Sequence, residues 1–302
     1  MTSQRHEARL PVARDRSGAA KAPAARGTHK PARGTQALLL TALALGGVLT
    51  VFPLLWVAMS SLKRPDEILK VPVQLFPEDW TNFDNFIALF AEHNFGRYIT
   101  NSFIVSSIGI ISSLVIAMLA AYAFSFHKFR FKEPMFVLVL ALFMVPPEAL
   151  AIPQYLMVSK VGLVNTYLGL AFPDLFTVLG VYLLRQFMEG IPYSYVEAAR
   201  VDGAGELRIL ARIITPMVAP AIAVFVIIKF LFTWNVFLWP LLVAQDESMY
   251  TVTVGLVNFA GSEFNQWNLI NAATVISMIP TIILFVTLQR YLVKGVAMSG
   301  IK

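Results

Sequence analysis

The sequence predicts an all-α membrane protein with six transmembrane helices and both termini in the cytoplasm. Three observations predict this fold class. Of the 302 residues, 57% are hydrophobic and 14% are charged, whereas soluble domains carry about 25% charged residues. Six apolar segments reach the roughly 20 residues that a helix needs to cross a bilayer. Most Lys and Arg residues lie on one side of these segments, and such residues favour the cytoplasm.

The six apolar segments lack the alternating pattern of membrane barrel strands, so we expect each of them to be a helix. They are residues 36–59, 99–126, 135–158, 166–187, 216–242 and 268–292. The connectors on the side of the two termini hold 18 Lys and Arg residues, and those on the other side hold 5. This asymmetry places the N-terminus and the C-terminus inside the cell.

The chain divides into four predicted regions. Residues 1–35 hold eight basic and two acidic residues among Ala, Pro and Gly, which predicts a disordered cytoplasmic tail. Residues 36–98 contain the first transmembrane helix and an extracytoplasmic segment with a short helix near residues 83–91. Residues 99–292 contain the other five spans, and residues 293–302 form a cytoplasmic C-terminal tail. The basic tail fixes topology beside the lipid bilayer and lacks the folded module of a nucleic-acid-binding protein.

Several kinds of chemistry are excluded by composition. The chain has no cysteine, which rules out disulfides, cysteine-ligated metals and a cysteine nucleophile. Its four histidines are scattered and do not predict a metal site: His6, His29, His93 and His127. No Gly-x4-Gly-Lys-Ser/Thr phosphate loop occurs, so the chain cannot hydrolyse ATP by that mechanism. We therefore expect neither enzymatic activity nor a cofactor.

The connector of residues 189–216 lies between spans four and five. Its sequence predicts a helix, a sharp turn at Gly203 and Gly205, and a second helix from Glu206 to Ile214, followed by Pro216. Its small residues allow the close approach of a docking partner. The alternative for such a short amphipathic element is a helix that lies on lipid headgroups.

The same connector resembles the EAA motif of ABC importer permeases, which reads E-A-A-x3-G-x9-I-x-L-P. The matching residues here are Glu197, Ala198, Ala199, Gly203, Ile213 and Pro216, with Thr215 in place of the leucine. Further segments are similar to the maltose-type carbohydrate permeases, the binding-protein-dependent inner-membrane components. They are VGLVNTYLGL (161–170), YLLRQF (182–187), WN with FLWPL (234–241) and QRY (289–291). The resemblance extends from residue 36 to the end of the chain.

This resemblance implies a transport subunit of a bacterial or archaeal cell membrane that imports a sugar or a related polyhydroxylated solute. Its implied partners are a second homologous permease subunit, two ABC ATPase subunits and an extracytoplasmic solute-binding protein. The implied cytoplasmic coupling helix carries the residues that transmit force from the ATPase: Glu197, Ala198, Ala199, Asp202 and Gly203. An ABC permease for a non-carbohydrate solute is the nearest alternative.

Four residues inside span five are candidates for the substrate pathway. Lys229 either lines a cavity or is structural, paired with Glu148, Asp174 or helix-end carbonyls, because an unpaired charge at membrane depth is costly. Phe232, Asn235 and Trp239 share another face of a continuous helix. Aromatic rings and an amide suit a sugar, although such aromatic residues also serve in helix packing or face lipid.

Two other classes of membrane protein are weaker alternatives. A secondary transporter needs coupling carboxylates near the midplane or an inverted repeat, and neither is evident. A membrane-embedded enzyme needs a nucleophile–base set or a metal cluster, and none is evident in the sequence. Pro146-Pro147 is expected to break span three beside Glu148, which shapes the cavity or a gate rather than binding a solute.

Overall fold

The computed structural model describes residues 33–260 and 266–299, and every regular element in this part of the chain is a helix. The all-α fold class is confirmed for the described residues. Most of the predicted basic tail, up to residue 32, and the last three residues lie outside them. The described residues divide into two compact units at residue 51, the first of residues 33–51 and the second of residues 52–260 and 266–299.

The first unit contains the N-terminal part of α1, the helix Arg33–Ser60. The side chains of residues 36–51 are apolar or small, apart from Gln36 and the two Thr residues, and they are exposed. A helix that is apolar on all sides is typical of a lipid-facing span. The segment Gln36–Ser60 is long and apolar enough to cross a membrane, in agreement with the first predicted span.

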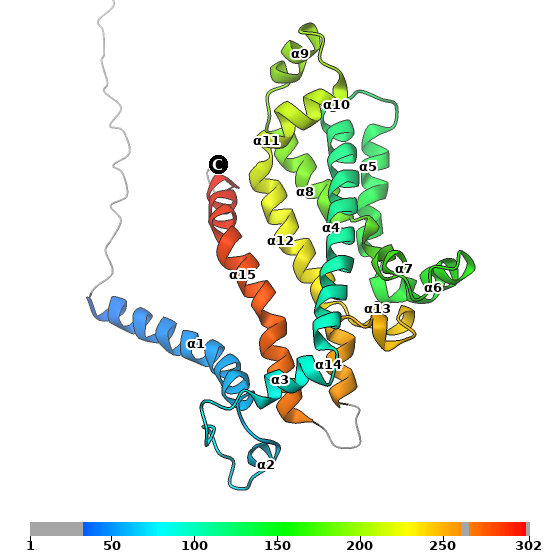
Figure 1. Cartoon of the computed structure of the whole chain (residues 1–302). Coiled ribbons are helices and arrows are strands. Elements are labelled where there is room, and N and C mark those ends of the chain that lie inside the picture. Colours follow the sequence, from blue (N-terminus) through cyan, green and yellow to red (C-terminus); the bar gives the residue numbers. More distant parts are fainter. Residues whose placement is uncertain (1–32, 261–265, 300–302) are drawn as a thin grey trace, which may run out of the picture. The chain divides into compact units, whose positions relative to one another are not determined.

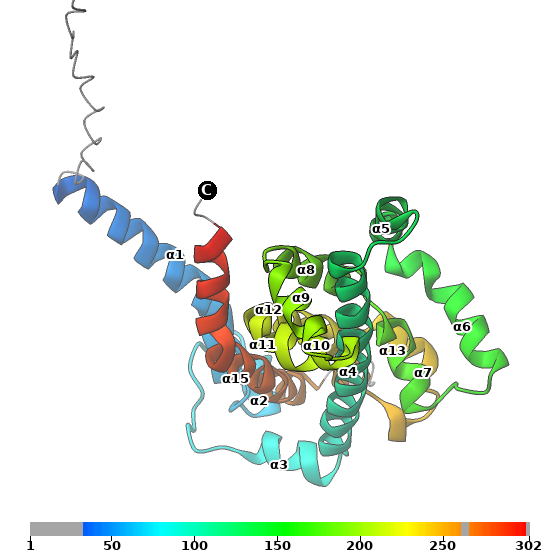
Figure 2. The same ribbon diagram turned by 90° about the horizontal axis from the view of Figure 1, so that it is seen from above.

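The second unit is organised around α4, the helix Phe95–Phe126. Figures 1 and 2 show α4 alongside α8 (Val178–Glu189) and α12 (Ala219–Asn235), and it contacts both of them. The long C-terminal helix α15 (Trp267–Ser299) packs against α12 and against α14 (Val252–Ala260). The helix α15 continues through Ser299, past the predicted end of the last span at residue 292.

Three of the predicted spans are bent pairs of helices rather than straight rods. By length and composition, α4, Gln36–Ser60 and Trp267–Gln289 can each cross a membrane, and the number rises to six if each bent pair is one span. The pairs are Lys132–Met144 with Pro147–Lys160, bent by 92°, Tyr167–Leu175 with Val178–Glu189, bent by 47°, and Glu206–Met217 with Ala219–Asn235, bent by 81°. The expectation of uninterrupted helices for spans four and five is therefore wrong.

Proline accounts for these bends, because its nitrogen cannot donate the helical hydrogen bond. In span three, Pro146-Pro147 separates α5 (Lys132–Ala141) from α6 (Ala151–Lys160), as expected, and Figure 2 shows α6 leaving the line of α5. Short 3-10 helices, Leu142–Met144 and Pro147–Leu150, flank this break. In span four, Pro173 lies in the 3-10 helix Phe172–Leu175 that follows α7 (Tyr167–Ala171).

Span five is interrupted twice. Pro220 lies in the first turn of α12, four residues after Pro216, so two N–H donors about one turn apart are missing there. The second interruption follows Asn235, where Val236 adopts an extended conformation before α13 (Leu238–Val243) begins. Pro240 cannot donate to the carbonyl of Val236, which instead accepts the hydroxyl of Thr253 at 2.7 Å. The freed backbone group is thus satisfied within the protein.

The connector between α1 and α4 is ordered, as expected. It contains α2 (Pro65–Ile68) and α3 (Asp84–Ala91), and α3 confirms the short helix predicted near residues 83–91. Buried polar side chains hold its backbone. Asn85 donates to the carbonyls of Ser61 and Lys63 at 2.8 and 2.9 Å, and the ammonium of Lys63 donates to the carbonyl of Gln74 at 2.6 Å.

Candidate functional site

The connector of residues 190–217 leaves the helix bundle as a helical hairpin (Figure 1). We call residues 194–209 the hairpin: α9 (Ser194–Val201), a turn, and α10 (Glu206–Ile209). A π-helical turn, Leu210–Ile214, and α11 (Thr215–Met217) lead from it to α12. The predicted order of helix, turn and helix is confirmed.

The turn of the hairpin depends on Gly203, whose φ is +78°. Its N–H donates to the carbonyl of Arg200, and the N–H of Ala204 donates to that of Ala199 at 2.9 Å. These two bonds form a Schellman motif, in which glycine occupies the left-handed position. A Cβ added to Gly203 would have no atom of this chain within 4 Å. The backbone conformation, not a lack of space within the chain, therefore requires glycine.

The residue that departs from the EAA pattern has a structural role. Thr215 stands where the pattern has leucine, and both its N–H and its hydroxyl donate to the carbonyl of Leu210, the hydroxyl at 2.8 Å. This carbonyl lies at the start of the π turn just before Pro216. Such π turns are rare and occur often at functional sites. Thr215 thus stabilises the turn that joins the hairpin to α12.

One face of the hairpin is open to a partner. Glu197 is exposed, and its side chain forms no hydrogen bond or ion pair with the described residues; Ala198 is exposed beside it. Val201 and Leu207 are exposed apolar side chains, at 86% and 73%. Ala199, in contrast, is buried in the core of the chain itself. The open face therefore includes Glu197 and Ala198 but not the side chain of Ala199, and the part of Ala199 in coupling stays a prediction.

The other face of the hairpin carries a network of charged and hydroxyl groups. Arg200 donates to both carboxylate oxygens of Glu206, at 2.7 and 3.1 Å, and to the hydroxyl of Tyr193 at 2.7 Å. Glu206 also accepts the hydroxyl of Tyr122 at 2.6 Å, and His127 lies 3.4 Å away. The bonds from Arg200, and then that from Tyr122, lower the pKa of Glu206 to about 2. The bonds with Glu206 hold the pKa of Arg200 above its usual value.

Lys229 is buried, and its ammonium forms an ion pair with Asp174 at a distance of 2.5 Å. Asp174 was one of the two acids named for this pairing, whereas Glu148 forms no ion pair with a described residue. Gly109 of α4 lies against the same site, since a Cβ there would be 2.9 Å from the Cβ of Asp174. The pairing offsets the cost of placing each charge at membrane depth.

The expected face of Phe232, Asn235 and Trp239 does not form, because α12 ends at Asn235. Phe232 and Asn235 are exposed, and the amide of Asn235 donates to the carbonyl of Leu231 at 2.7 Å. Trp239 lies on α13, where it is buried and donates its indole N–H to the carbonyl of Gly169 at 3.0 Å. Of these three residues, only Phe232 and Asn235 have exposed side chains.

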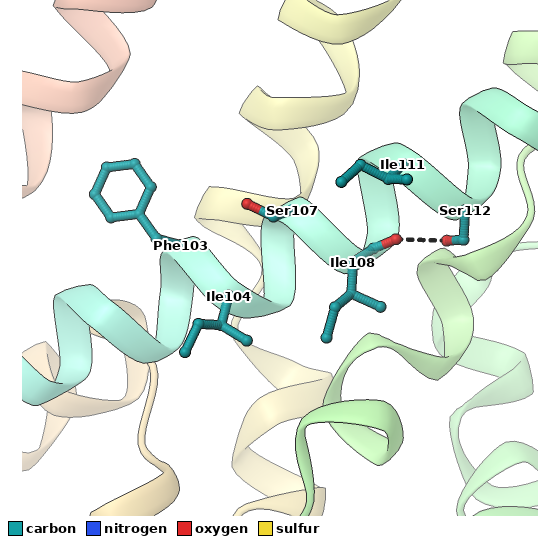
Figure 3. Close-up of a pocket in the computed structure, with 6 residues that line it drawn as sticks. All are labelled: Phe103, Ile104, Ser107, Ile108, Ile111 and Ser112. Carbon is teal, nitrogen blue, oxygen red and sulfur yellow. Dashed lines mark hydrogen bonds between the residues drawn. The ribbon is translucent and has the colours of Figure 1, made fainter.

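The sequence did not point to a shallow groove of about 540 Å³ that runs along α4. Figure 3 shows its lining residues, which all come from this helix: Phe103, Ile104, Ser107, Ile108, Ile111 and Ser112. The hydroxyl of Ser112 donates to the carbonyl of Ile108 at 2.6 Å, while Ser107 is exposed. The ring of Phe103 lies 4.9 Å from that of Trp234 on α12. In the sequence, Phe103 and Ser107 stand four positions apart, and this helical spacing could have placed both on one face of α4.

The sequence is similar to a known protein family and to several of its members. Residues 113–298 match the family described as binding-protein-dependent transport system inner membrane component. The arabinooligosaccharides transport system permease protein AraQ of Halalkalibacterium halodurans is 32% identical over 267 residues, which cover 88% of this chain and 96% of AraQ. The sn-glycerol-3-phosphate transport system permease protein UgpE of Agrobacterium fabrum is 33% identical over 262 residues, covering 84% and 93% of the two chains.

The fold is also that of a solved transporter. A chain in the crystal structure of a bacterial ABC transporter involved in the import of the acidic polysaccharide alginate matches with a TM-score of 0.75. The match covers 86% of this chain and 98% of that chain at 22% sequence identity. A second structure, in complex with an alginate pentasaccharide-bound periplasmic protein, matches with a TM-score of 0.60 and 17% identity.

Proposed function

The chain belongs to the family of binding-protein-dependent transport system inner membrane components, and from this premise we propose that it is a permease subunit of an ABC importer. The solute is a sugar or a related polyhydroxylated molecule. The similarity to an arabinooligosaccharide permease and to a glycerol-phosphate permease supports a polyhydroxylated solute. The chain works with a second permease subunit, two ATPase subunits and an extracytoplasmic binding protein.

The hairpin is the observation that carries this proposal. Its open face combines an unpaired carboxylate, Glu197, with the exposed Ala198 and the apolar side chains of Val201 and Leu207. Exposed apolar patches rimmed by polar groups are typical of protein interaction sites. In the proposed function, α9 is the coupling helix and this face docks in a cleft of one ATPase subunit. Asp202 and Gly203, also exposed at the turn, belong to the same contact.

The proposed topology has six spans with both termini in the cytoplasm. Each bent pair contributes one span in this topology. In the third pair, α10 and the π-helical turn lie outside the membrane, and the basic residues of the connectors then follow the positive-inside rule. The hairpin lies on the cytoplasmic side, where ATP is available. The solute pathway passes the exposed Phe232 and Asn235, while Lys229 and Trp239 are structural because both are buried with bonded polar groups.

Co-purification followed by reconstitution tests the proposal. The tagged chain, extracted from native membranes, is expected to bring with it a similar permease and an ATPase that contains a phosphate loop. Vesicles with these proteins and the binding protein should take up the solute only with ATP inside. Uptake by the chain alone, driven by an ion gradient, would instead support a secondary transporter. An amino acid or peptide found in the binding protein would support a non-carbohydrate permease.

A further inference from the structure

We propose that Glu206 is the positioning residue that connects the hairpin to α4, so that movement of α9 is transmitted to the end of this central helix. The inference rests on the proposed function, in which α9 docks on an ATPase subunit. The residues assigned to docking are Glu197, Ala198, Val201, Asp202, Gly203 and Leu207. Glu206 is not among them, and its role is transmission rather than docking.

The carboxylate of Glu206 joins three elements. It receives two parallel N–H bonds from Arg200 in the last turn of α9, and Glu206 itself begins α10. It also accepts the hydroxyl of Tyr122, which lies in the last two turns of α4, and faces His127 directly after that helix. Two-pronged bonds between a guanidinium and a carboxylate fix orientation as well as distance. Rotation of α9 therefore cannot occur without moving the hydroxyl of Tyr122 or breaking this contact.

The apolar contacts of the hairpin cannot provide this control by themselves. Val196, Ala199 and Ile209 pack into the same hydrophobic cluster as Tyr122 and Phe126. Burial of apolar surface is not directional, so it holds the hairpin against the bundle without fixing its rotation. The Tyr193 ring stacks on that of Phe126 at 6.4 Å, and Arg200 holds the Tyr193 hydroxyl. The charged network thus fixes the rotation of the hairpin, and the apolar cluster holds the hairpin against the helix bundle.

The helix α4 is suited to receive such a movement. It contacts α7, α8, α12 and α14 within the second unit, so its displacement reaches elements of several spans. It also carries the groove that includes Phe103 and Ser107. Tyr122 is buried at 4% exposure and therefore cannot follow the hairpin without moving its helix. A link at Tyr122 converts hairpin rotation into movement of the groove-bearing helix.

The first test measures coupling in the whole complex. ATP hydrolysis and solute uptake are measured in the same vesicles, reconstituted with both permeases, the ATPases and the binding protein. The variants are Glu206→Gln, which removes the charge, and Tyr122→Phe, which removes one hydroxyl far from the docking face. The matched control is Tyr182→Phe, since the Tyr182 hydroxyl is exposed on α8 and forms no bond with a described residue.

We expect both variants to keep ATPase binding and hydrolysis while the uptake per ATP falls by about tenfold, equivalent to about 1.4 kcal/mol, the order of one charged hydrogen bond. Tyr182→Phe should match the parent. The exchange Arg200→Glu with Glu206→Arg should restore part of the uptake, because the Tyr122 hydroxyl can accept a bond as well as donate one. An unchanged uptake-to-hydrolysis ratio in both variants would overturn the proposal.

Loss of ATPase binding in Tyr122→Phe would also overturn it, since Glu206 and Tyr122 would then belong to docking. If Glu206→Gln does not assemble, Tyr122→Phe alone decides. A parent complex without ATP-driven uptake would instead refute the proposed function. The two failures are therefore distinguishable.

A second measurement tests geometry independently of transport. The chain has no native cysteine, so nitroxide labels attach only at introduced positions. Labels at Ser194→Cys on α9 and Val115→Cys on α4, both exposed, report the angle of the hairpin in the assembled complex. We expect a narrow distribution of distances in the parent and in Tyr182→Phe, and a broad one in Glu206→Gln and Tyr122→Phe. Equal widths in all four proteins would contradict a positioning role.

Discussion

The ammonium nitrogen of Lys229 lies 2.5 Å from a carboxylate oxygen of Asp174, and both side chains are largely withdrawn from the surface. The pair joins α12 to the 3-10 helix at the bend of span four, where Pro173 interrupts the helix. The backbone of α4 at Gly109 touches the Cβ region of Asp174, so three segments meet at this pair. The pair therefore holds the bend of span four against α12 and α4.

Breaking this pair should destabilise the protein. Lys229→Met leaves the Asp174 carboxylate without its partner, and removal of one member of a buried pair costs about 3–5 kcal/mol. We expect lower thermal stability and a lower yield of purified protein. The double variant Lys229→Met with Asp174→Asn, which has no unpaired charge, should recover most of both. Normal stability of the single variant would show that its ammonium group reaches the membrane surface instead.

Asn101 is expected to be important for stability at the other end of α4. Its buried amide donates to the carbonyls of Ser248 and Tyr250 at 2.8 and 2.9 Å and accepts the hydroxyl of Tyr167 at 2.9 Å. Asn101→Ala leaves the carbonyl of Tyr250 and the hydroxyl of Tyr167 without these partners, at about 1–3 kcal/mol each, whereas the carbonyl of Ser248 keeps its bond from Arg97. Thermal unfolding in detergent should reveal a clear loss. The neighbouring Thr100→Ala removes only a bond within its own helix and should change little. Equal effects of the two substitutions would contradict this assignment.

The contacts of Glu206 predict a specific dependence on pH. The hydrogen bonds from Arg200 and then from Tyr122 lower the pKa of this carboxyl from its ordinary value of 4.5 to about 2. The stability from its charged contacts is thus fully present above about pH 4.5 and is lost as the pH falls toward 2. The difference in melting temperature between the parent and Glu206→Gln should be constant from about pH 6 to 8 and should shrink below about 4.5.

His127 contacts the same carboxylate, so the comparison is repeated in a His127→Gln background. The difference in melting temperature should keep the same dependence on pH there. A difference that grows as the pH falls would contradict the assigned direction of the pKa shift.

Much of this architecture could be predicted from the sequence, because it follows from local patterns. Apolar length predicted the long helices, the proline pair predicted the break at Pro146-Pro147, and the glycine at 203 predicted a sharp turn. The cost of an unpaired charge in a membrane predicted a partner for a structural Lys229, and Asp174 was one of the candidates beside Glu148 and helix-end carbonyls. These features depend on residues close together in the sequence or, for Lys229, on the cost of burying an unpaired charge.

The remaining features depend on tertiary contacts. The end of α12 at Asn235 is possible because Thr253, seventeen residues after Val236, satisfies the freed carbonyl. The buried Trp239 bonds its indole N–H to the carbonyl of Gly169, seventy residues earlier in the chain. The contact between Tyr122 and Glu206 joins residues 84 positions apart. No periodicity in the sequence encodes such pairs.

Asn235 tests the proposed pathway. Its side chain is exposed and bonds only to the carbonyl of Leu231 in its own helix, so Asn235→Ala should leave folding and assembly unchanged. The Asn235 amide is expected to bond a hydroxyl of the solute, and the loss of one such bond costs about 1 kcal/mol of binding free energy. The uptake rate should therefore fall roughly fivefold. Initial uptake rates at several solute concentrations measure the effect. Thr100→Ala serves as the control, and uptake equal to that of the parent would remove Asn235 from the pathway.

Gly203 offers the sharpest test of the coupling helix. Its φ of +78° is unfavourable for valine, whereas asparagine tolerates the left-handed region, and neither side chain meets an atom of this chain within 4 Å of its Cβ. Gly203→Val should therefore distort the hairpin turn and weaken ATPase docking, with the membrane spans still inserted.

Gly203→Asn keeps the turn and adds bulk only toward a partner. If a docked ATPase subunit approaches the glycine closely, this variant should also lose binding, by at least as much as Glu197→Ala, which removes a single polar contact. The measurements are ATPase binding to the purified permease pair and hydrolysis stimulated by the binding protein. If Gly203→Val leaves both unchanged, the hairpin does not dock. If only the valine variant fails, the turn matters and the partner does not contact Gly203.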